Sequence, residues 1–424
     1  MTEPKQPFEI NLDEALVPDY TLPDPMLMSN GQPVRDAATW REKRREEILE
    51  LFLTQVYGAT PSAAVEVHAT VISCSDAALA SRAVRKEVRL HFSTERGSAS
   101  MDLLIYLPAE RTRPVPLFVG LNFWGNHSIH PDPSITLSSR WMPEDAERGI
   151  QNHRATPSSR GQSVSRWPVE TILGRGYGLA TAYYGDLAPD DPSLFRDGLH
   201  SLFDGDDDRG SPQGQPVADE WGAIGAWARG LSRALDHFEK EEQIDHSRVA
   251  VLGHSRLGKA ALWAGAQDQR FAIVISNESG CGGAALSRRQ FGETVEAINT
   301  RFPHWFCGNF KQYSAYVDRL LVDQHMLLAL MAPRPLYVAS AEQDLWADPR
   351  GEFLAARAAS PVYRLLGVDG LATEMMPPVG QPVLGQPGLG TVGYHIRPGE
   401  HDLTEYDWLQ FLDFADRHLV TLQT

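Results

Sequence analysis

The segment of this sequence that most clearly suggests chemistry is Val249-Ala-Val-Leu-Gly-His-Ser-Arg-Leu-Gly-Lys259. A short apolar run with β-branched residues ends in Gly253-His-Ser-Arg-Leu-Gly258, and a run of small residues typical of a helix follows. This pattern predicts a strand, a sharp turn and a helix, the arrangement called a nucleophile elbow, with Ser255 at its tip. The positive end of the helix then favours negative charge that develops beside Ser255. The alternative, that Ser255 only caps the helix, leaves Gly258 unexplained.

A serine hydroxyl attacks poorly unless a base takes its proton, and the base needs an acid to orient it. After a nucleophile elbow, these partners follow in the order Ser, Asp or Glu, His. The best candidate for the base is His401, in Gly399-Glu-His-Asp-Leu403 before the last predicted helix, although a histidine there can also cap a helix. His395 is the second candidate, and His304 and His325 also lie between the elbow and the last helix.

Two carboxylates compete for the role of the acid. Glu278, in Ser276-Asn-Glu-Ser-Gly-Cys281, follows the apolar run after the elbow, and Asp344, in Ala341-Glu-Gln-Asp-Leu-Trp346, follows the next one. Both positions are predicted carboxyl ends of strands, where ligands collect in open α/β sheets. The sequence leaves open a shared role, and it also leaves open that either carboxylate only stabilises a turn.

Two cations stand close to the predicted nucleophile. The residue after the nucleophile usually contributes only its backbone N–H to the oxyanion hole, and Arg256 at this position adds a charged donor. The alternative is that Arg256 pairs with a nearby carboxylate and holds the elbow. Lys259 lies one helical turn beyond Ser255 and is expected to reach toward the mouth of the pocket; the alternative is a solvated helix lysine.

The rest of the chain predicts the sheet and helices that position these residues. Segments 64–75 and 86–108 alternate apolar and polar residues, which indicates an antiparallel opening to a sheet. Buried strand-like runs then begin at Val115, Gly178, Val249, Phe271 and Pro335. Helices are expected at 37–55, 219–240, 256–268, 314–331, 350–365 and 404–419. Apolar strands with crossover helices predict a parallel sheet covered on both faces. The expected fold is therefore an α/β-hydrolase fold, a three-layer sandwich with a mostly parallel central sheet.

The predicted domain organisation is simple. Residues 126–170 and 196–218 are rich in Ser, Pro, Asp, Gly and Arg, and we expect them to be loop insertions around the active site. Residues 376–399 are rich in Pro and Gly and lead into His401. We expect residues 1–424 to form one domain with an irregular N-terminal segment, residues 1–34.

Charge and composition limit the classes of partner. The formal net charge of the 424 residues is −16 at pH 7, so nucleic acid and anionic membrane surfaces are poor partners. No apolar run approaches the roughly 20 residues that span a bilayer, and the first residues lack the apolar stretch of a signal peptide. We expect a monomer.

The cysteines and histidines give no metal pattern. Cys74, Cys281 and Cys307 form no CxxC motif, and we expect three buried free thiols, with a Cys281–Cys307 bridge as the alternative. The sequence contains no HExxH motif. We therefore expect neither a metal nor another cofactor.

Several motifs together resemble the glucuronoyl esterases of carbohydrate esterase family 15, bacterial type. The matching segments are 253–259, 277–279, 291–293, 301–306, 344–346 and His401, with 121–127 and 175–186 upstream. The likeness runs from about residue 115 to 415, and G-x-S-R-x-G-K is far more specific than G-x-S-x-G. This family cleaves esters that join the 4-O-methyl-glucuronic acid branches of xylan to lignin alcohols, and most of its members are exported.

The resemblance also implies residue roles. Ser255 would be the nucleophile, His401 the base, Glu278 the acid and Arg256 an oxyanion donor. The uronate sugar would be bound by Lys259, Glu293 and Trp346, to which we add Arg301 and Trp305 as candidates. The residue types suit a sugar ring, because Glu293 accepts hydrogen bonds from hydroxyls, Lys259 donates them, and tryptophans offer apolar faces. For Trp305, a place in the core is an equal alternative.

One departure from the fungal members concerns a disulfide. Those members carry cysteines just before the nucleophile and just after the catalytic histidine. Here the two positions hold His254 and Asp402, for which we expect a hydrogen-bonded ion pair.

Two other functions remain open at this point. The chain could be an acetyl xylan esterase or small-ester carboxylesterase, which hydrolysis of p-nitrophenyl acetate compared with benzyl glucuronate would separate. It could also be an inactive hydrolase fold that only binds carbohydrate, which a serine-directed phosphonate would then fail to label.

Overall fold

The protein is described by a computed structural model that covers residues 10–61, 64–203, 218–385 and 390–419. Parts of three predicted irregular segments lie outside the described residues, namely 1–9, 204–217 and 386–389. Among the described residues, no helix combines the length and apolar composition needed to cross a membrane.

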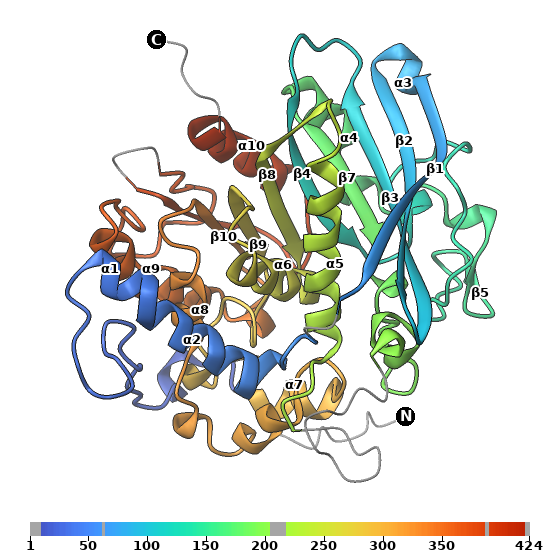
Figure 1. Cartoon of the computed structure of the whole chain (residues 1–424). Coiled ribbons are helices and arrows are strands. Elements are labelled where there is room, and N and C mark those ends of the chain that lie inside the picture. Colours follow the sequence, from blue (N-terminus) through green and yellow to red (C-terminus); the bar gives the residue numbers. More distant parts are fainter. Residues whose placement is uncertain (1–9, 62–63, 204–217, 386–389, 420–424) are drawn as a thin grey trace.

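A nine-stranded sheet runs through the protein in the order β1-β2-β3-β7-β4-β8-β9-β10-β11 (Figure 1). The first pairings, from β1 to β7, are antiparallel, and the pairings from β7 to β11 are parallel. The strands are β1 (Glu66–Ala77), β2 (Ala83–Thr94), β3 (Gly97–Pro108), β4 (Val115–Asn122), β7 (Gly178–Tyr183), β8 (Ile244–His254), β9 (Ile273–Asn277), β10 (Leu336–Ala341) and β11 (Val392–Arg397). A short hairpin, β5 (Ile150–Gln151) and β6 (Arg154–Ala155), stands apart in the 126–170 insertion.

Helices cover both faces of this sheet. They are α1 (Ala37–Thr39), α2 (Arg45–Phe52), α3 (Ala78–Ser81), α4 (Val169–Gly174), α5 (Ala223–Phe238), α6 (Arg256–Gln267), α7 (Val295–Arg301), α8 (Gln324–Ala329), α9 (Pro349–Leu365) and α10 (Glu405–Leu419). One hydrophobic cluster holds the buried residues of α5, α6, α8 and α9, and a second holds those of α4 and α10.

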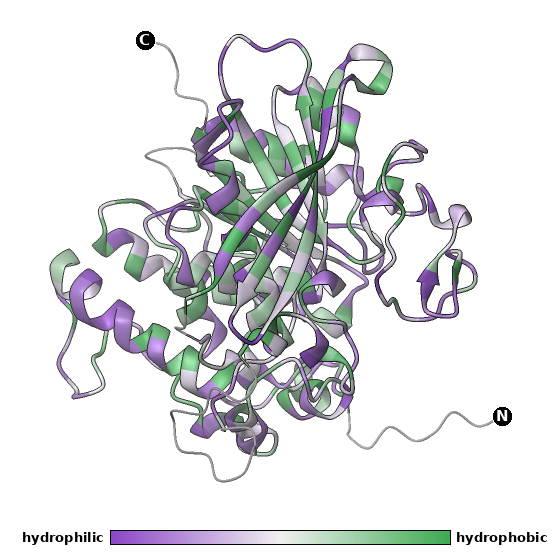
Figure 2. Ribbon diagram, turned by 45° about the vertical axis from the view of Figure 1, so that its right-hand side comes forward, coloured by the Kyte–Doolittle hydropathy of each residue, from purple (hydrophilic) through white to green (hydrophobic). Residues whose placement is uncertain are grey.

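The strands divide their side chains between these two clusters. Along β4, Leu117 and Val119 belong to the first cluster and Phe118 to the second, because successive side chains of a strand point to opposite faces. Hydrophobic residues accordingly concentrate along the sheet and the helices packed on it (Figure 2). The predicted three-layer α/β-hydrolase fold is confirmed. Because one sheet joins residues 66 to 397, we propose that the chain forms one domain.

Two elements differ from the sequence-based prediction. The helix expected over 314–331 is reduced to α8, because the buried Asp323 side chain accepts from the backbone N–H of Gln324 and fixes the helix start there. The Pro/Gly-rich segment 376–399 contains β11, which pairs in parallel with β10. All six residues of β11 are buried, but a glycine, a histidine and an arginine among them hide the apolar run that marks a buried strand.

The predicted elbow is confirmed and explains both of its glycines. Ser255 joins β8 to α6 with φ 57° and ψ −130°, a strained conformation of the kind found at functional sites. A Cβ on Gly253 would collide with the carbonyl oxygen of Leu257, and one on Gly258 would lie 2.9 Å from Ser279 Cβ. The strand and the helix therefore approach as closely as they do only because both positions lack a side chain.

We expect Gly253→Ala to destabilise the fold by about 1–3 kcal/mol or more, since the added methyl meets rigid backbone. Gly174→Ala is the matched control, because a Cβ there meets nothing within 4 Å. Urea unfolding of both variants measures the difference. Equal midpoints for the two variants would show that the elbow tolerates a side chain at Gly253.

Candidate active site

The predicted catalytic residues come together at one edge of the sheet, where the parallel strands end. Ser255 follows β8, Glu278 follows β9, and Asp344 and His401 follow β10 and β11. The ring of His254, next to Ser255, lies 4.5 Å from the ring of His401 between centroids. Ser255 occupies the N-cap position of α6, yet its side chain makes no cap hydrogen bond. The interpretation of Ser255 as a helix cap is therefore wrong.

His401 is held by both candidate acids. Its Nδ1 lies 2.6 Å from Asp344 Oδ2 and 3.2 Å from Glu278 Oε2. Burial by itself would lower the pKa of His401, but the hydrogen bonds with Asp344 and Glu278 outweigh it and raise the pKa to about 9. With Nδ1 engaged by carboxylates, Nε2 is the nitrogen left to take a proton from a serine, as in a catalytic triad.

The two carboxylates are not equivalent. Glu278 also accepts from Arg397 Nη2 at 2.6 Å and from the Asp402 backbone N–H at 3.0 Å. Burial raises the pKa of Glu278 to about 7 in spite of these partners. The second carboxylate oxygen of Asp344, Oδ1, accepts from the Ala347 backbone N–H at 3.3 Å. The distances thus favour Asp344 as the closer partner of His401, whereas the family resemblance favours Glu278.

A third carboxyl group ties the segments of these two acids together. Glu352 of α9 is fully buried and accepts from Ser340 Oγ at 2.6 Å and from the Gly280 backbone N–H at 3.0 Å. Burial raises the pKa of Glu352 to about 8. Because Ser340 lies in β10 and Gly280 follows Glu278, one side chain sets the spacing between the two acid-bearing loops.

Arg256 has the carboxylate partner that the alternative interpretation requires. Its Nη1 pairs with Asp190, while its Nε is buried without a hydrogen-bond acceptor. The guanidinium carbon lies 4.8 Å from the centroid of Trp305 and 5.4 Å from that of Phe302. The guanidinium is thus both paired and held between rings, and 28% of the side chain remains exposed at the elbow.

The predicted sugar-binding residues lie beside the elbow. Lys259 Nζ donates to the Ser279 carbonyl at 2.6 Å and lies 3.5 Å from Glu293 Oε2. Both side chains are buried, so the alternative of a solvated Lys259 is wrong. Glu293 is joined to Trp346 through a backbone hydrogen bond of 2.8 Å, and the Arg301 guanidinium lies 5.0 Å from the centroid of the Trp346 ring.

Trp305 belongs both to the site and to the buried interior. It is 3% exposed and stacks on Phe302 with 3.8 Å between centroids and 3° between planes. Its indole Nε1 donates to Asp190 at 2.6 Å. The two alternatives for Trp305, core and site, are therefore not exclusive.

The competing histidines have structural partners. His395 is fully buried in β11, where Nε2 lies 2.8 Å from Asp407 and Nδ1 lies 3.0 Å from the Tyr337 hydroxyl. His304 contacts Asp190 at 2.8 Å and His325 contacts the Pro23 carbonyl at 2.8 Å. The bonds of these three histidines run to groups other than the candidate acids, so His401 stays the candidate base.

The expected pair of His254 and Asp402 is wrong. His254 Nδ1 lies 2.9 Å from the Asn277 amide nitrogen, and Asp402 instead accepts from Arg166 Nε at 2.6 Å. Burial, followed by the charge of His401, holds the pKa of His254 well below its ordinary value, so the ring is neutral. At the position of the fungal cysteine, this chain therefore has an imidazole ring that packs against the ring of His401.

All three cysteines are free thiols, so the alternative of a Cys281–Cys307 bridge is wrong. Cys281 and Cys307 are buried as expected, but Cys74 is exposed. Cys74 lies in β1, at the edge of the sheet, where a strand lacks neighbours on one side.

Four residues of the site were missed by the sequence analysis: Arg397, Glu352, Asp190 and Phe123. Arg397 lies in the strand that was not predicted, and Glu352 lies inside a helix whose charged residues are expected to face solvent. Asp190 and Phe123 follow β7 and β4. The rule that located Glu278 and Asp344, a position just beyond a strand, would have found Phe123 as well, whereas Asp190 lies farther on, beyond the helical turn Tyr184–Asp186.

The ligand atoms of Glu278, Asp344 and His401 lie within 4.8 Å of one another, which is a spacing able to hold a metal ion. His401 Nδ1 bonds to Asp344 and pairs with Glu278 within this group. A nitrogen held by carboxylates at these distances is the arrangement that an acid–base pair needs.

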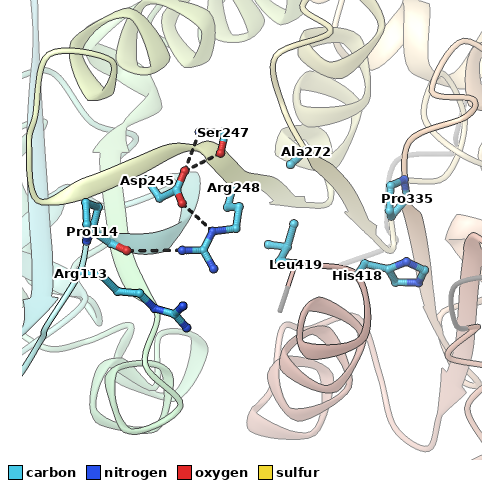
Figure 3. Close-up of a pocket in the computed structure, with 9 residues that line it drawn as sticks. All are labelled: Arg113, Pro114, Asp245, Ser247, Arg248, Ala272, Pro335, His418 and Leu419. Atoms are coloured by element: carbon cyan, nitrogen blue, oxygen red, sulfur yellow. Dashed lines mark hydrogen bonds and ion pairs between the residues drawn. The ribbon is translucent and has the colours of Figure 1, made fainter. Parts of the chain in front are cut away.

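A surface pocket of about 580 Å³ lies elsewhere (Figure 3). Its lining includes Pro114, Ala272 and Pro335, which precede β4, β9 and β10, and an ion pair between Asp245 and Arg248 at 2.7 Å. These are the amino ends of the parallel strands. The pocket is therefore at the opposite edge of the sheet from Ser255 and is not part of the candidate site.

Comparisons with known proteins agree with this geometry. The sequence model described as "Glucuronyl esterase, fungi" matches residues 216–367. The chain is 50% identical over 414 residues to carbohydrate esterase MZ0003 of an unknown prokaryotic organism, covering 98% of this chain and 93% of that protein. A structure described as a promiscuous CE15 esterase from a marine bacterial metagenome has a TM-score of 0.89 at 49% identity, covering 97% of this chain and 100% of that one. A glucuronoyl esterase from Solibacter usitatus has a TM-score of 0.88 at 48% identity, with 96% and 100% covered.

We expect Asp344→Asn to lower kcat for ester hydrolysis more than Glu278→Gln does, because Asp344 makes the shorter contact with His401. The double variant should lose less than the product of the single losses, because both acids act through one nitrogen. Steady-state kinetics of the three variants test this. The control is Asp245→Asn, a change at the amino end of β8, away from the candidate site. A larger loss in Glu278→Gln would assign the acid to the loop after β9.

The pH dependence should reflect the pKa of His401. Attack requires the neutral imidazole, so kcat/KM should rise with pH with a midpoint above the ordinary 6.5, toward about 9. Asp344→Asn removes the closer carboxylate and should move the midpoint to lower pH. A rate profile from pH 5 to 10 measures both midpoints, and an unchanged midpoint in the variant would refute this coupling.

Proposed function

We propose how the residues of this site hydrolyse an ester, given that the chain belongs to the glucuronoyl esterases of carbohydrate esterase family 15. The chain is a carboxylic ester hydrolase that cleaves esters of 4-O-methyl-glucuronic acid. The observation that carries the mechanism is the strained Ser255 at the elbow, whose neighbour His254 packs 4.5 Å from the ring of His401, the histidine held by two buried carboxylates.

In the proposed first half of the reaction, Ser255 Oγ attacks the ester carbonyl while His401 Nε2 takes the hydroxyl proton. The charge gained by His401 is stabilised by Asp344 and Glu278. Arg256 stabilises the oxyanion through its guanidinium and its backbone N–H, and the loop that begins at Phe123 supplies the second N–H typical of this fold. The C–O bond to the alcohol then breaks, and the alcohol leaves with the proton from His401.

In the proposed second half, water replaces the alcohol. His401 takes a proton from the water as its oxygen attacks the acyl-enzyme carbonyl. The bond to Ser255 Oγ then breaks, Ser255 regains its proton from His401, and the glucuronic acid is released. The oxyanion of the second half is stabilised by the same donors as that of the first half, so one arrangement of charges serves both halves of the reaction.

We place the uronate ring against Lys259, Glu293 and Trp346, with Arg301 and Trp305 at its border. The buried pair of Lys259 and Glu293 offers a donor and an acceptor to ring hydroxyls, and half-buried Trp346 offers an apolar face. The substrate that fits is the uronate branch of glucuronoxylan esterified to a lignin alcohol.

A second proposed activity is hydrolysis of small esters. One relative with a closely similar structure is described as a promiscuous esterase, so a comparison of p-nitrophenyl acetate with benzyl glucuronate is worthwhile for this chain. The ordered set of nucleophile, base and acids argues against an inactive carbohydrate-binding module. A monomeric state remains a prediction that size-exclusion chromatography with light scattering would test.

We expect Ser255→Ala to abolish turnover of benzyl glucuronate while the melting temperature stays within a few degrees of wild type. The reason is that Ser255 makes no cap hydrogen bond that alanine would lose. Ser247→Ala, in the same strand at the opposite edge, is the control. Turnover that survives in Ser255→Ala would exclude Ser255 as the nucleophile.

We expect Arg256→Ala to lower kcat by about 10²-fold or more, the effect of losing one preorganised oxyanion donor. KM should change little, because the oxyanion forms only after substrate is bound. Arg256→Lys should rescue poorly, since a lysine lacks the planar fork that reaches both Asp190 and the oxyanion. A variant with a lowered melting temperature and full kcat would instead restrict Arg256 to holding the elbow.

A further inference from the structure

We propose that Asp190 is a positioning residue for this reaction: its carboxylate fixes the Arg256 guanidinium where the oxyanion forms. This inference rests on the proposed role of Arg256 and extends it to a residue outside the triad and the sugar-binding set. Asp190 follows β7 and its short helical turn Tyr184–Asp186, at the same edge of the sheet as Ser255.

The two oxygens of the Asp190 carboxylate are bonded to four donor groups. Oδ1 accepts from His304 Nε2 at 2.8 Å and from Trp305 Nε1 at 2.6 Å. Oδ2 pairs with Arg256 Nη1 and accepts from the Tyr184 hydroxyl at 3.3 Å. The side chain is only 3% exposed. Every lone-pair direction of the carboxylate is therefore engaged, which holds the group in one orientation.

Asp190 stays charged in this environment. Burial would raise its pKa, but the hydrogen bond from His304 and the charge of Arg256 lower the pKa to about 2. A buried carboxylate that remains ionised can hold a cation in a fixed place, whereas a neutral acid offers a much weaker partner. The pairing thus persists across the pH range in which His401 works as a base.

The same carboxylate also fixes the aromatic surface on which Arg256 lies. Trp305 is bonded to Asp190 through its indole and stacks on Phe302, and the Arg256 guanidinium carbon lies 4.8 Å from the Trp305 centroid. The Arg256 guanidinium carbon also lies 5.8 Å from the centroid of the Phe123 ring. Arg256 is therefore held by an ion pair and by rings whose own position depends on the same anchor.

This arrangement has a specific consequence for catalysis. A flexible arginine would have to reorganise when the oxyanion forms, whereas a charge fixed beforehand stabilises it without that cost. Since the oxyanion is absent from the bound substrate, loss of the anchor should reduce kcat and leave KM nearly unchanged. Loss of a residue that only stabilised the fold would not reduce kcat at an unchanged KM.

The test is Asp190→Asn, a variant of the same shape, assayed with benzyl glucuronate alongside its melting temperature. We expect kcat to fall about ten-fold or more, with KM within two-fold. In the Arg256→Ala background, Asp190→Asn should cause no further loss, because its effect passes through the guanidinium. The control is Asp323→Asn, which removes another buried carboxylate bonded to an arginine, Arg288, and should keep wild-type kcat.

Asp190→Glu serves as a second variant that keeps the charge and moves the carboxylate by one methylene. It should fold and lose part of kcat. The proposal is overturned if Asp190→Glu keeps full kcat, or if Asp190→Asn causes the same loss with and without Arg256. If Arg256→Ala itself keeps full kcat, the proposed oxyanion role falls along with this inference. If only Asp190→Asn is without effect, the proposed function stands and the positioning role is wrong.

Discussion

The contact between His401 and its two buried carboxylates is the interaction on which the rest of the site depends. Carboxylates removed from water are costly unless they are paired and hydrogen-bonded. Asp344 is compensated by His401, and Glu278 by His401, Arg397 and a backbone N–H. The cost that remains is seen in the raised pKa of Glu278. His401 becomes a stronger base as a result, because both acids stabilise its protonated form.

The sheet supplies the rigid frame that this charge arrangement needs. Ser255 and Glu278 both have positive φ, at 57° and 48°, and such strain persists only where the surroundings fix it. At Ser255, the glycines at positions 253 and 258 allow β8 and α6 to approach closely. At Glu278 the fixed partner is Glu352, which ties the loop after β9 to β10. Backbone strain at Ser255 and Glu278 and the buried carboxyl group of Glu352 therefore both fix the loops that carry the candidate catalytic residues.

The two cations near Ser255 are also compensated by buried groups of opposite charge. Arg256 and Lys259 are cations inside a protein of net charge −16, and each is paired with a buried carboxylate, Asp190 or Glu293. The Arg256 guanidinium keeps one unused donor, because its buried Nε has no hydrogen-bond acceptor. In the proposed mechanism, Ser255 has a base supported by carboxylates on one side and a cation paired with Asp190 on the other, which suits a reaction that transfers a proton to the base and builds negative charge beside the cation.

The sequence by itself determined the elbow, the three-layer fold and the positions of Glu278 and Asp344 just beyond two predicted strands, because these depend on local periodicity and on glycines at fixed spacing. It could not identify β11, whose polar residues His395 and Arg397 are buried because Asp407 pairs with both and the Tyr337 hydroxyl bonds to His395. It also could not rank Asp344 against Glu278 or place His254 against His401. Those outcomes depend on distances between segments more than a hundred residues apart in some cases, and such distances are set by how the strands pack, which no local pattern records.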